Sequence, residues 1–305
     1  MKTHGKSAFT LIELLVVIGI IGVLSAVMLG LLGGTSDAAR ATQCMNNLRE
    51  LAVAVNNFTM QDNDGHYPPA GSLKWTSYGS GASYPERAGW ISWNTKGGKS
   101  DSSKACPSYI TFSEGDAELL RYAITNGCLW AMGGRTEKVY QCPVHDAACL
   151  KASKRHPGWS YVMNEAFGWN SSGRPFANWA GVSRGNLSVY DTTSGKTVPR
   201  PPEQVLLFAE IQGLTDAKRG LTANVNGSGN RGDGVLQYKN DNETIGFNHA
   251  LSGGKLAGHV AFADGHVEKL IYPEGGGVDQ LTKWLCSGRP VSFDGTRYQD
   301  LQNSN

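Results

Sequence analysis

The feature that most constrains this chain is an uncharged apolar run near its N-terminus. Residues 14–32 contain no charged side chain, and the hydroxyl of Ser25 is the one polar group among them. A helix over these residues rises about 28 Å, close to the roughly 30 Å hydrocarbon thickness of a bilayer. We therefore expect a transmembrane helix, with Lys2 and Lys6 keeping the N-terminus in the cytoplasm.

A carboxylate directly before this run argues against a plain membrane anchor. At bilayer depth a side chain such as Glu13 costs about 2.5 to 3.5 kcal/mol, so its presence indicates a charged partner. An ordinary secretory signal would place a small-residue cleavage site after the run, but only Gly30, Gly33 and Gly34 lie there, without an Ala-x-Ala pattern. An uncleaved anchor remains the alternative, although it has no use for the carboxylate.

The stretch from Ala8 to Ile18 resembles the class III signal of type IV pilins and type II secretion pseudopilins. The resemblance implies that a prepilin peptidase cuts between Ala8 and Phe9 and methylates the new amino group. Ala8 stands where the family usually has Gly. Glu13 becomes the fifth mature residue, and the resemblance implies that it neutralises the Phe9 amine of a neighbouring subunit during assembly.

The chain divides into three parts: a leader at 1–8, a transmembrane and stalk helix at 9–60, and an extracytoplasmic head at 61–305. In the stalk, apolar residues recur at spacings of three and four, which predicts a face that packs on the head. These residues are Cys44, Leu48, Leu51, Val55 and Phe58. The expected fold class is α+β, pilin-like, with a small antiparallel sheet in the head.

Strand signals in the head lie at 205–209, 259–263 and 266–270, and Asp264-Gly265 predicts a hairpin between the last two. A short helix is expected at 278–285, and the tail 298–305 reads as polar and mobile.

The residues His249, Asp264 and Gly265 resemble the C-terminal signature of pilin-like proteins with an H-X9-DG processing-associated domain. Here fourteen residues separate His249 from Asp264. Further segments extend the same resemblance: Tyr67-Pro68-Pro69, the Cys-Pro pairs at Cys106 and Cys142, and residues 202–210.

Six cysteines follow the apolar run, on the side expected to be oxidising, so disulfide bonds that stabilise the head are predicted. The candidates are Cys44, Cys106, Cys128, Cys142, Cys149 and Cys286. No Cys-x-x-Cys pair points to zinc.

No metal site, cofactor or enzymatic activity is predicted. His249, His259, Asp264 and His266 offer suitable donors, but facing residues of a hairpin explain them more simply. Calcium or another metal in the head stays open, because residues 62–65 begin like a calcium loop yet lack its distal Glu. Neither Gly-x-Ser-x-Gly nor His-Glu-x-x-His occurs.

These observations favour a structural subunit of a pilus-like filament, either a type II secretion pseudopilin or a type IV pilin-like protein. The expected partners are prepilin peptidase, other pilin or pseudopilin subunits and an inner-membrane assembly platform. The chain would cross the inner membrane once, with a periplasmic or extracellular head, and enter a filament after assembly. Nucleic acid is not expected, because without Lys2 and Lys6 the chain carries 26 basic and 26 acidic residues.

Two alternatives remain. One is a membrane-tethered protein whose aromatic-rich head recognises a polysaccharide or partner, using residues such as Trp90, Trp93, Trp159, Trp169 and Trp179. The other is an anchored metal-dependent enzyme.

Overall fold

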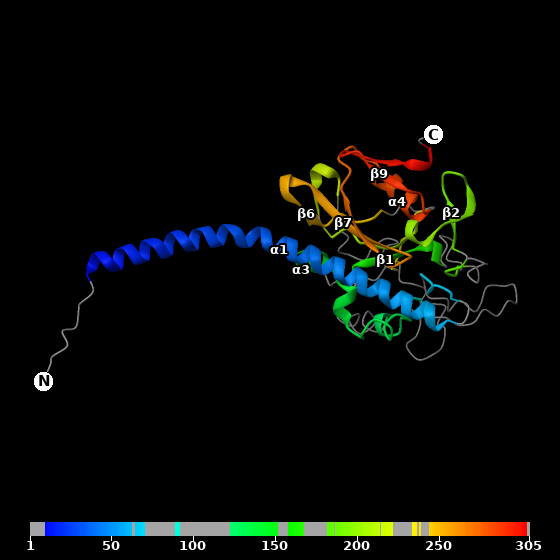
Figure 1. Cartoon of the computed structure of the whole chain (residues 1–305), viewed down its shortest axis with the longest axis horizontal. Helices are drawn as coiled ribbons and strands as arrows, with labels where there is room; N and C mark the ends of the chain where they lie inside the picture. The colour runs from blue at the N-terminus through cyan, green and yellow to red at the C-terminus, as the bar shows by residue number, and fades with distance from the viewer. Residues whose placement is uncertain are drawn as a thin grey trace.

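The computed structural model consists of one long N-terminal helix that projects from an α+β head (Figure 1). It describes residues 10–62, 65–70, 89–91, 123–151, 158–167, 182–185, 187–213, 215–221, 234–236, 238 and 244–303; inside helices, the side chains of residues 26–36 and 148–151 are not among those described. The α+β class expected from the sequence is confirmed.

Helix α1 runs from Leu11 to Gln61 without a break. A capping box starts it: the Glu13 amide donates to the Thr10 hydroxyl, and the Thr10 amide donates to the Glu13 carboxylate at 2.8 Å. Asp62, in an extended conformation, ends it. The predicted apolar segment and the predicted stalk are therefore parts of one helix.

In the part of the chain that the structure describes, no helix is long and apolar enough to cross a membrane. Among the described residues, the structure thus gives no support to the transmembrane segment expected at 14–32. The side chains of residues 26–32 of that segment are not described.

The second half of α1 packs across the sheet of the head. Cys44, Leu48, Leu51 and Val55 are fully buried, as the apolar spacing predicts, while Phe58 is half-buried against the same core. The remaining surface of this half is mostly polar, with Val53 and Met60 as exposed apolar exceptions, so this part of the helix is solvated on one face and buried on the other.

The central sheet has the strand order β5-β1-β4-β7-β6, with β8 also paired to β7. Its strands are β1 (Tyr161–Asn164), β4 (Leu206–Glu210), β5 (Val235–Leu236), β6 (His249–Ala250), β7 (Leu256–Phe262) and β8 (Val267–Ile271). All pairs are antiparallel except β1 with β5. The antiparallel sheet expected from the sequence is therefore mixed.

The β7–β8 hairpin forms as the Asp264-Gly265 pair predicts, with Gly265 at φ +100°. Ala257 pairs with both His249 and Ile271, so β6 and β8 lie on opposite edges of β7. Strand β4 pairs with the later residues of β7 on the edge that β6 uses. Strands β4 and β6 consequently follow one another along a single edge of β7.

Smaller elements surround this sheet. They are α3 (Pro143–Lys151), α4 (Val278–Cys286), the pair β2 (Ser188–Asp191) and β3 (Lys196–Pro199), the pair β9 (Val291–Phe293) and β10 (Tyr298–Asp300), and the 3-10 turns η2 (Glu137–Tyr140), η3 (Glu165–Phe167), η5 (Pro202–Gln204), η6 (Ala217–Arg219), η8 (Ser252–Gly254) and η9 (Leu301–Asn303).

Residues 298–303 pack on the head, which corrects the expectation of a mobile tail for this part of the C-terminal segment; residues 304 and 305 lie outside the described residues. Residues 298–300 pair with β9, and the Leu301 amide donates to the Pro290 carbonyl at 3.0 Å. Asp300 is buried and contacts Arg289. A polar composition misled the prediction here, because these polar groups are satisfied inside the protein.

Candidate functional site

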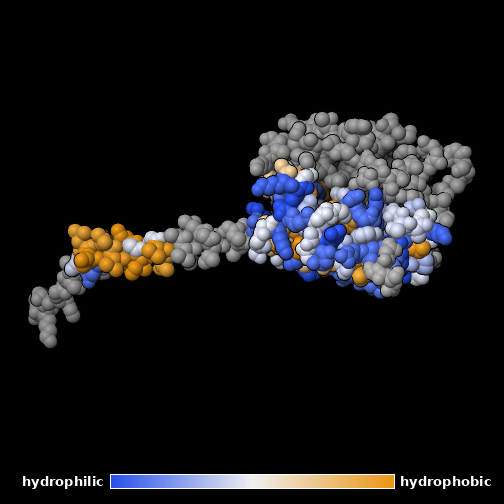
Figure 2. Space-filling view, turned by 90° about the horizontal axis from the view of Figure 1, so that it is seen from above, coloured by the Kyte–Doolittle hydropathy of each residue, from blue (hydrophilic) through white to orange (hydrophobic). Residues whose placement is uncertain are grey.

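The projecting half of α1 is apolar on all sides. Every described side chain from Leu11 to Ser25 is exposed, and large ones such as Leu11 and Ile12 are 82% and 72% exposed. Figure 2 shows this apolar end of the helix standing away from the head. A helix that is hydrophobic all round is stable only when other apolar groups cover it.

At the start of this helix lie the residues assigned to processing and assembly. Ala8 and Phe9 fall outside the described residues. In the single chain, the carboxylate of Glu13 accepts hydrogen bonds from the amide and the hydroxyl of Thr10, both at 2.8 Å. The residue predicted to act in assembly thus completes the helix cap in the single chain.

The residues of the C-terminal signature do not come together. His249 pairs with Ala257 near the start of β7, whereas Asp264 and Gly265 form the turn after its end. Asp264 instead contacts His266, whose ring stacks on Phe262 with centroids 4.3 Å apart. Asp264 and His266 are exposed or nearly so at this turn and cannot share a metal ion with His249.

A second group of polar residues lies buried where β4 and β6 meet along β7. Oε1 of Glu210 is 3.0 Å from Nε2 of His249 and 3.0 Å from Nδ1 of His259. Its Oε2 accepts from the Asn248 amide at 3.2 Å. All of these side chains are buried. Burial alone would raise the pKa of Glu210, but the charge and hydrogen bonds of the two histidines hold that pKa to about 2.

Two thiols complete this group. The Sγ atoms of Cys44 on α1 and Cys142, directly before α3, together with donor atoms of Glu210 and His249, all lie within 4.8 Å of one another. Burial opposes ionisation of Cys142, yet a hydrogen bond from Cys44 and the nearby His249 lower the pKa of Cys142 to about 7. The same hydrogen bond and burial raise the pKa of Cys44 well above its usual value.

The histidine is charged more readily than a free one. Burial would lower the pKa of His249, but Glu210 and Cys142 outweigh it and raise that pKa to about 10. The group therefore combines an anionic carboxylate, a cationic imidazole and an acidic thiol in the core of the head.

Cysteine chemistry in the structure differs from the expected disulfides. Cys44, Cys128 and Cys142 are free thiols and Cys286 forms no disulfide, which corrects the disulfide prediction for these four; Cys106 and the side chain of Cys149 are not described. The sequence did not reveal the thiol cluster, because Cys44 and Cys142 come from distant segments and meet only through packing. A Cys-x-x-Cys pattern detects neighbouring cysteines alone.

Sequence reasoning also missed the role of Glu210. The signal was a carboxylate at the end of the apolar strand Leu206–Ala209, where a buried charge needs partners. Its partners His249 and His259 were both candidates, but neither was connected to Glu210 or to the thiols. Asp62, the first residue of the possible calcium loop, instead accepts hydrogen bonds from the amide and ring of His66.

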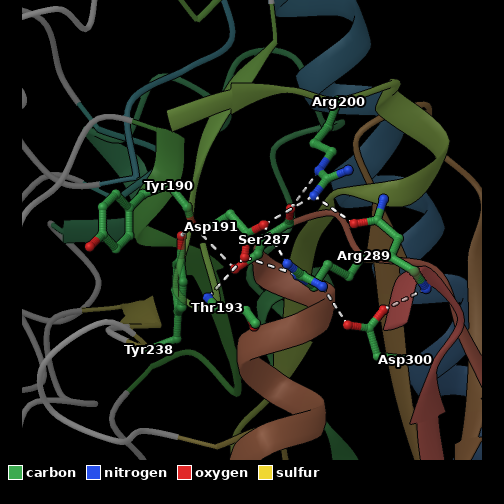
Figure 3. A network of polar contacts seen from close by, with 9 residues as sticks. Tyr190, Asp191, Thr193, Arg200, Tyr238, Ser287, Arg289 and Asp300 are labelled. Atoms are coloured by element: carbon green, nitrogen blue, oxygen red, sulfur yellow. Dashed lines mark hydrogen bonds and ion pairs between the residues drawn. The ribbon is translucent and has the colours of Figure 1, made fainter. Parts of the chain in front are cut away.

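A separate ion-pair network holds the C-terminal elements to the β2–β3 hairpin (Figure 3). The Arg289 guanidinium donates to both carboxylate oxygens of Asp191, at 2.9 and 2.7 Å, and also contacts Asp300. Arg200 donates to Asp191 from the other side at 3.3 Å. Burial would raise the pKa of Asp191, but the Arg289 hydrogen bonds lower it to about 2. Asp191, Arg289 and Asp300 are buried, so the network links the C-terminal elements to the rest of the head.

Comparison with protein families decides how the N-terminus is interpreted. Residues 3–29 match the prokaryotic N-terminal methylation motif. The chain carries a prepilin-type N-terminus. Residues 37–96 match a family described as a protein of unknown function (DUF1559), and the two matches together are typical of type II secretion pseudopilin-like proteins. Comparison with curated proteins and with solved structures finds no match.

The prepilin-type motif coincides with the exposed apolar half of α1, and the second match begins at the half that packs on the head. Cys44 lies within the second matched segment, whereas Cys142, Glu210 and His249 lie beyond it. The H-X9-DG assignment finds no support in these comparisons.

Proposed function

We propose that this chain is the membrane-anchored precursor of a subunit of a pilus-like filament, of the type IV pilin or pseudopilin class. The observation that carries the proposal is the coincidence of the methylation motif with a helix segment in which the side chains from Leu14 to Leu24 are all uncharged, non-polar and exposed. After removal of residues 1–8, these segments of neighbouring copies bury one another, and the heads form the outer surface.

Burial of this segment supplies the free energy of assembly. Apolar surface removed from water contributes about 25 cal/mol per Å², and large side chains such as Leu15, Ile18 and Ile21 are more than half exposed in the single chain. Glu13 sets the axial position of each subunit, because its carboxylate is stable among apolar helices only beside the Phe9 amine of a neighbour.

The head is proposed to act as a structural unit with no reaction of its own. Two tryptophans that were candidates for a binding face, Trp90 and Trp159, are fully buried and belong to the core. Trp93, Trp169 and Trp179 lie outside the described residues. The buried tryptophans favour the structural role over a surface-binding one.

The test is intact-mass analysis of the protein from its host, followed by separation of sheared surface fibres from membranes. We expect a chain that begins at Phe9 with one added methyl group and that occurs in the fibre fraction. Recovery of the chain with Met1 intact, or of a processed chain confined to membranes as single subunits, would contradict the proposal. The second result would favour a tethered surface-binding protein.

A further inference from the structure

The thiols of Cys44 and Cys142 and the ring of His249 converge inside the head from three segments far apart in the sequence. Cys44 is on α1, Cys142 precedes α3, and His249 is on β6. Their donor atoms lie within 4.8 Å of one another, and no side chain in the group is more than 2% exposed. Ligands around a tetrahedral Zn²⁺ lie about 3.3 to 3.8 Å apart, given bond lengths of about 2.0 to 2.3 Å. Small side-chain shifts close this group around one ion.

One nitrogen of His249 has a partner and the other does not. Nε2 is 3.0 Å from Glu210 Oε1, whereas Nδ1 is buried and has no hydrogen bond among the described residues. A buried ring nitrogen without a partner is costly whether it carries a proton or a lone pair, so this atom calls for a ligand. A metal ion bound at Nδ1 replaces the proton there, while Nε2 donates its hydrogen to Glu210.

Glu210 has the position of the carboxylate that orients a metal-bound histidine. In such sites the ligating imidazole donates its second N–H to a carboxylate, which fixes the ring and its tautomer. Glu210 is itself held by His259 at 3.0 Å and by Asn248 at 3.2 Å. The orientation of His249 is thus set by a second layer of buried hydrogen bonds.

The thiols are held in a similar way. The Tyr161 hydroxyl forms a hydrogen bond with Cys44 and accepts one from the Asn47 amide at 3.2 Å. This arrangement directs a polar hydrogen toward the Cys44 sulfur, where it stabilises a thiolate. Two thiolates balance the charge of a divalent ion, so the occupied site adds no net charge to the core.

We propose that Cys44, Cys142 and His249 bind a thiolate-preferring divalent metal ion of the Zn²⁺ class, with Glu210 as the positioning residue for His249. Two sulfurs and one imidazole exclude Ca²⁺ and Mg²⁺, which require oxygen ligands. Binding replaces the thiol protons, which leave to solvent, and involves no redox change. The ion ties α1, the helix that carries the assembly segment, to α3 and to the sheet.

A disulfide between Cys44 and Cys142 is the competing state of these thiols. It would use the two sulfurs alone and leave Nδ1 of His249 buried without a partner. A disulfide would therefore not explain why a buried carboxylate and imidazole lie beside the two sulfurs. A metal ion explains the position of all four groups.

The experiment uses the full chain purified in detergent under reducing, anaerobic conditions, with Zn²⁺ and Co²⁺ as probes. We expect about one Zn²⁺ per chain. The Co²⁺ form should show intense visible bands of tetrahedral coordination and a near-ultraviolet sulfur-to-cobalt charge-transfer band. These readouts need no variant and no filament, so they are independent of the proposed function. A reduced chain that binds neither ion would overturn the proposal.

Variants identify the ligands. Cys142→Ser and His249→Ala should lose the cobalt spectrum, whereas Cys286→Ser, which changes an equally buried cysteine outside the group, should keep it. Glu210→Gln should weaken Zn²⁺ binding about 10- to 100-fold and leave the charge-transfer band in place, as expected for a positioning residue. Loss of the spectrum in Cys286→Ser but not in Cys142→Ser would refute the assignment.

The protein from its host gives a final check. Mass analysis after unfolding in a chelator and alkylation without reduction should find Cys44 and Cys142 as alkylated free thiols. A Cys44–Cys142 disulfide in that material would contradict the metal site.

Discussion

Nε2 of His249 lies 3.0 Å from Oε1 of Glu210, although the strands that carry them do not pair with each other. The contact exists because β4 and β6 follow one another along the same edge of β7. Strand β7 therefore acts as the template that brings a carboxylate and an imidazole together. The same template requires very close backbone packing at Gly258.

Replacing Gly258 with Ala should destabilise the head. A Cβ at this position would lie 2.0 Å from the Gly246 carbonyl oxygen, a backbone atom that cannot move aside. Overpacking of this kind costs about 1 to 3 kcal/mol or more. Thermal unfolding of the two proteins measures the effect. Gly185→Ala is the control, because a Cβ there meets nothing within 4 Å, and it should unfold at the wild-type temperature.

Replacing Glu13 with Ala should impair assembly and leave the head intact. The carboxylate lies in the first turn of α1, far along the helix from the head, so the unfolding temperature of the head should not change. Entry into filaments should fall on the order of tenfold, equivalent to about 1.4 kcal/mol. Comparison of sheared-fibre and membrane fractions measures this.

The control for that variant is Glu50→Ala, which removes an exposed carboxylate from the head-packed half of the same helix. It should enter filaments normally. If Glu13→Ala also does so, the pairing of Glu13 with the Phe9 amine is wrong, and the residue serves only as a helix cap.

Replacing Asn47 with Ala should weaken the junction between α1 and the head. The buried Asn47 amide donates to the Gln141 carbonyl at 2.8 Å and to the Lys138 carbonyl at 3.2 Å. Its loss removes these two bonds to part-buried carbonyls and a third to the buried Tyr161 hydroxyl, at about 0.5 to 1.5 kcal/mol each. Denaturant unfolding should show this loss. Asn57→Ala is the control, because Asn57 is exposed and makes one longer hydrogen bond, to the Met132 carbonyl. Its free energy of unfolding should fall by less than about 1 kcal/mol. Equal losses in the two variants would rule out the role of Asn47 at the junction.

The Asp191–Arg289 pair should make the free energy of unfolding fall as the pH is lowered into the acid range. The pKa of Asp191 is about 2 in the folded protein and 3.8 in a free side chain. A lowered carboxyl pKa gives stability that is fully present above pH 3.8 and is lost as pH falls toward 2. The difference corresponds to about 2 kcal/mol. Asp191→Asn should therefore be less stable at pH 7 and show a shallower decline between pH 4 and 2.

Urea unfolding across this pH range checks the prediction. Asp279→Asn, an exposed carboxyl on α4, serves as control and should keep the wild-type pH dependence. A parallel decline in wild type and Asp191→Asn would show that other groups cause the acid sensitivity.

Local chemistry in the sequence determined helix α1, from Leu11 to Gln61, to a large extent. The run after Glu13 lacks charges, and Cys44, Leu48, Leu51 and Val55 repeat at helical spacing, so a helix with two different halves follows from periodicity alone. The Asp264-Gly265 turn and the helix at Val278 were likewise predictable, because a turn and a short amphipathic helix depend on neighbouring residues.

Only the tertiary structure decided what lies inside the head. The group of Cys44, Cys142, Glu210 and His249 spans more than two hundred positions. No spacing rule connects residues on a helix, in a loop and on two strands that do not pair with each other. The polar C-terminal tail read as mobile because its partner, Arg289, could not be identified without the fold. Periodicity reports which face of a segment is buried, whereas the partners of a buried polar group are set by the packing of distant segments.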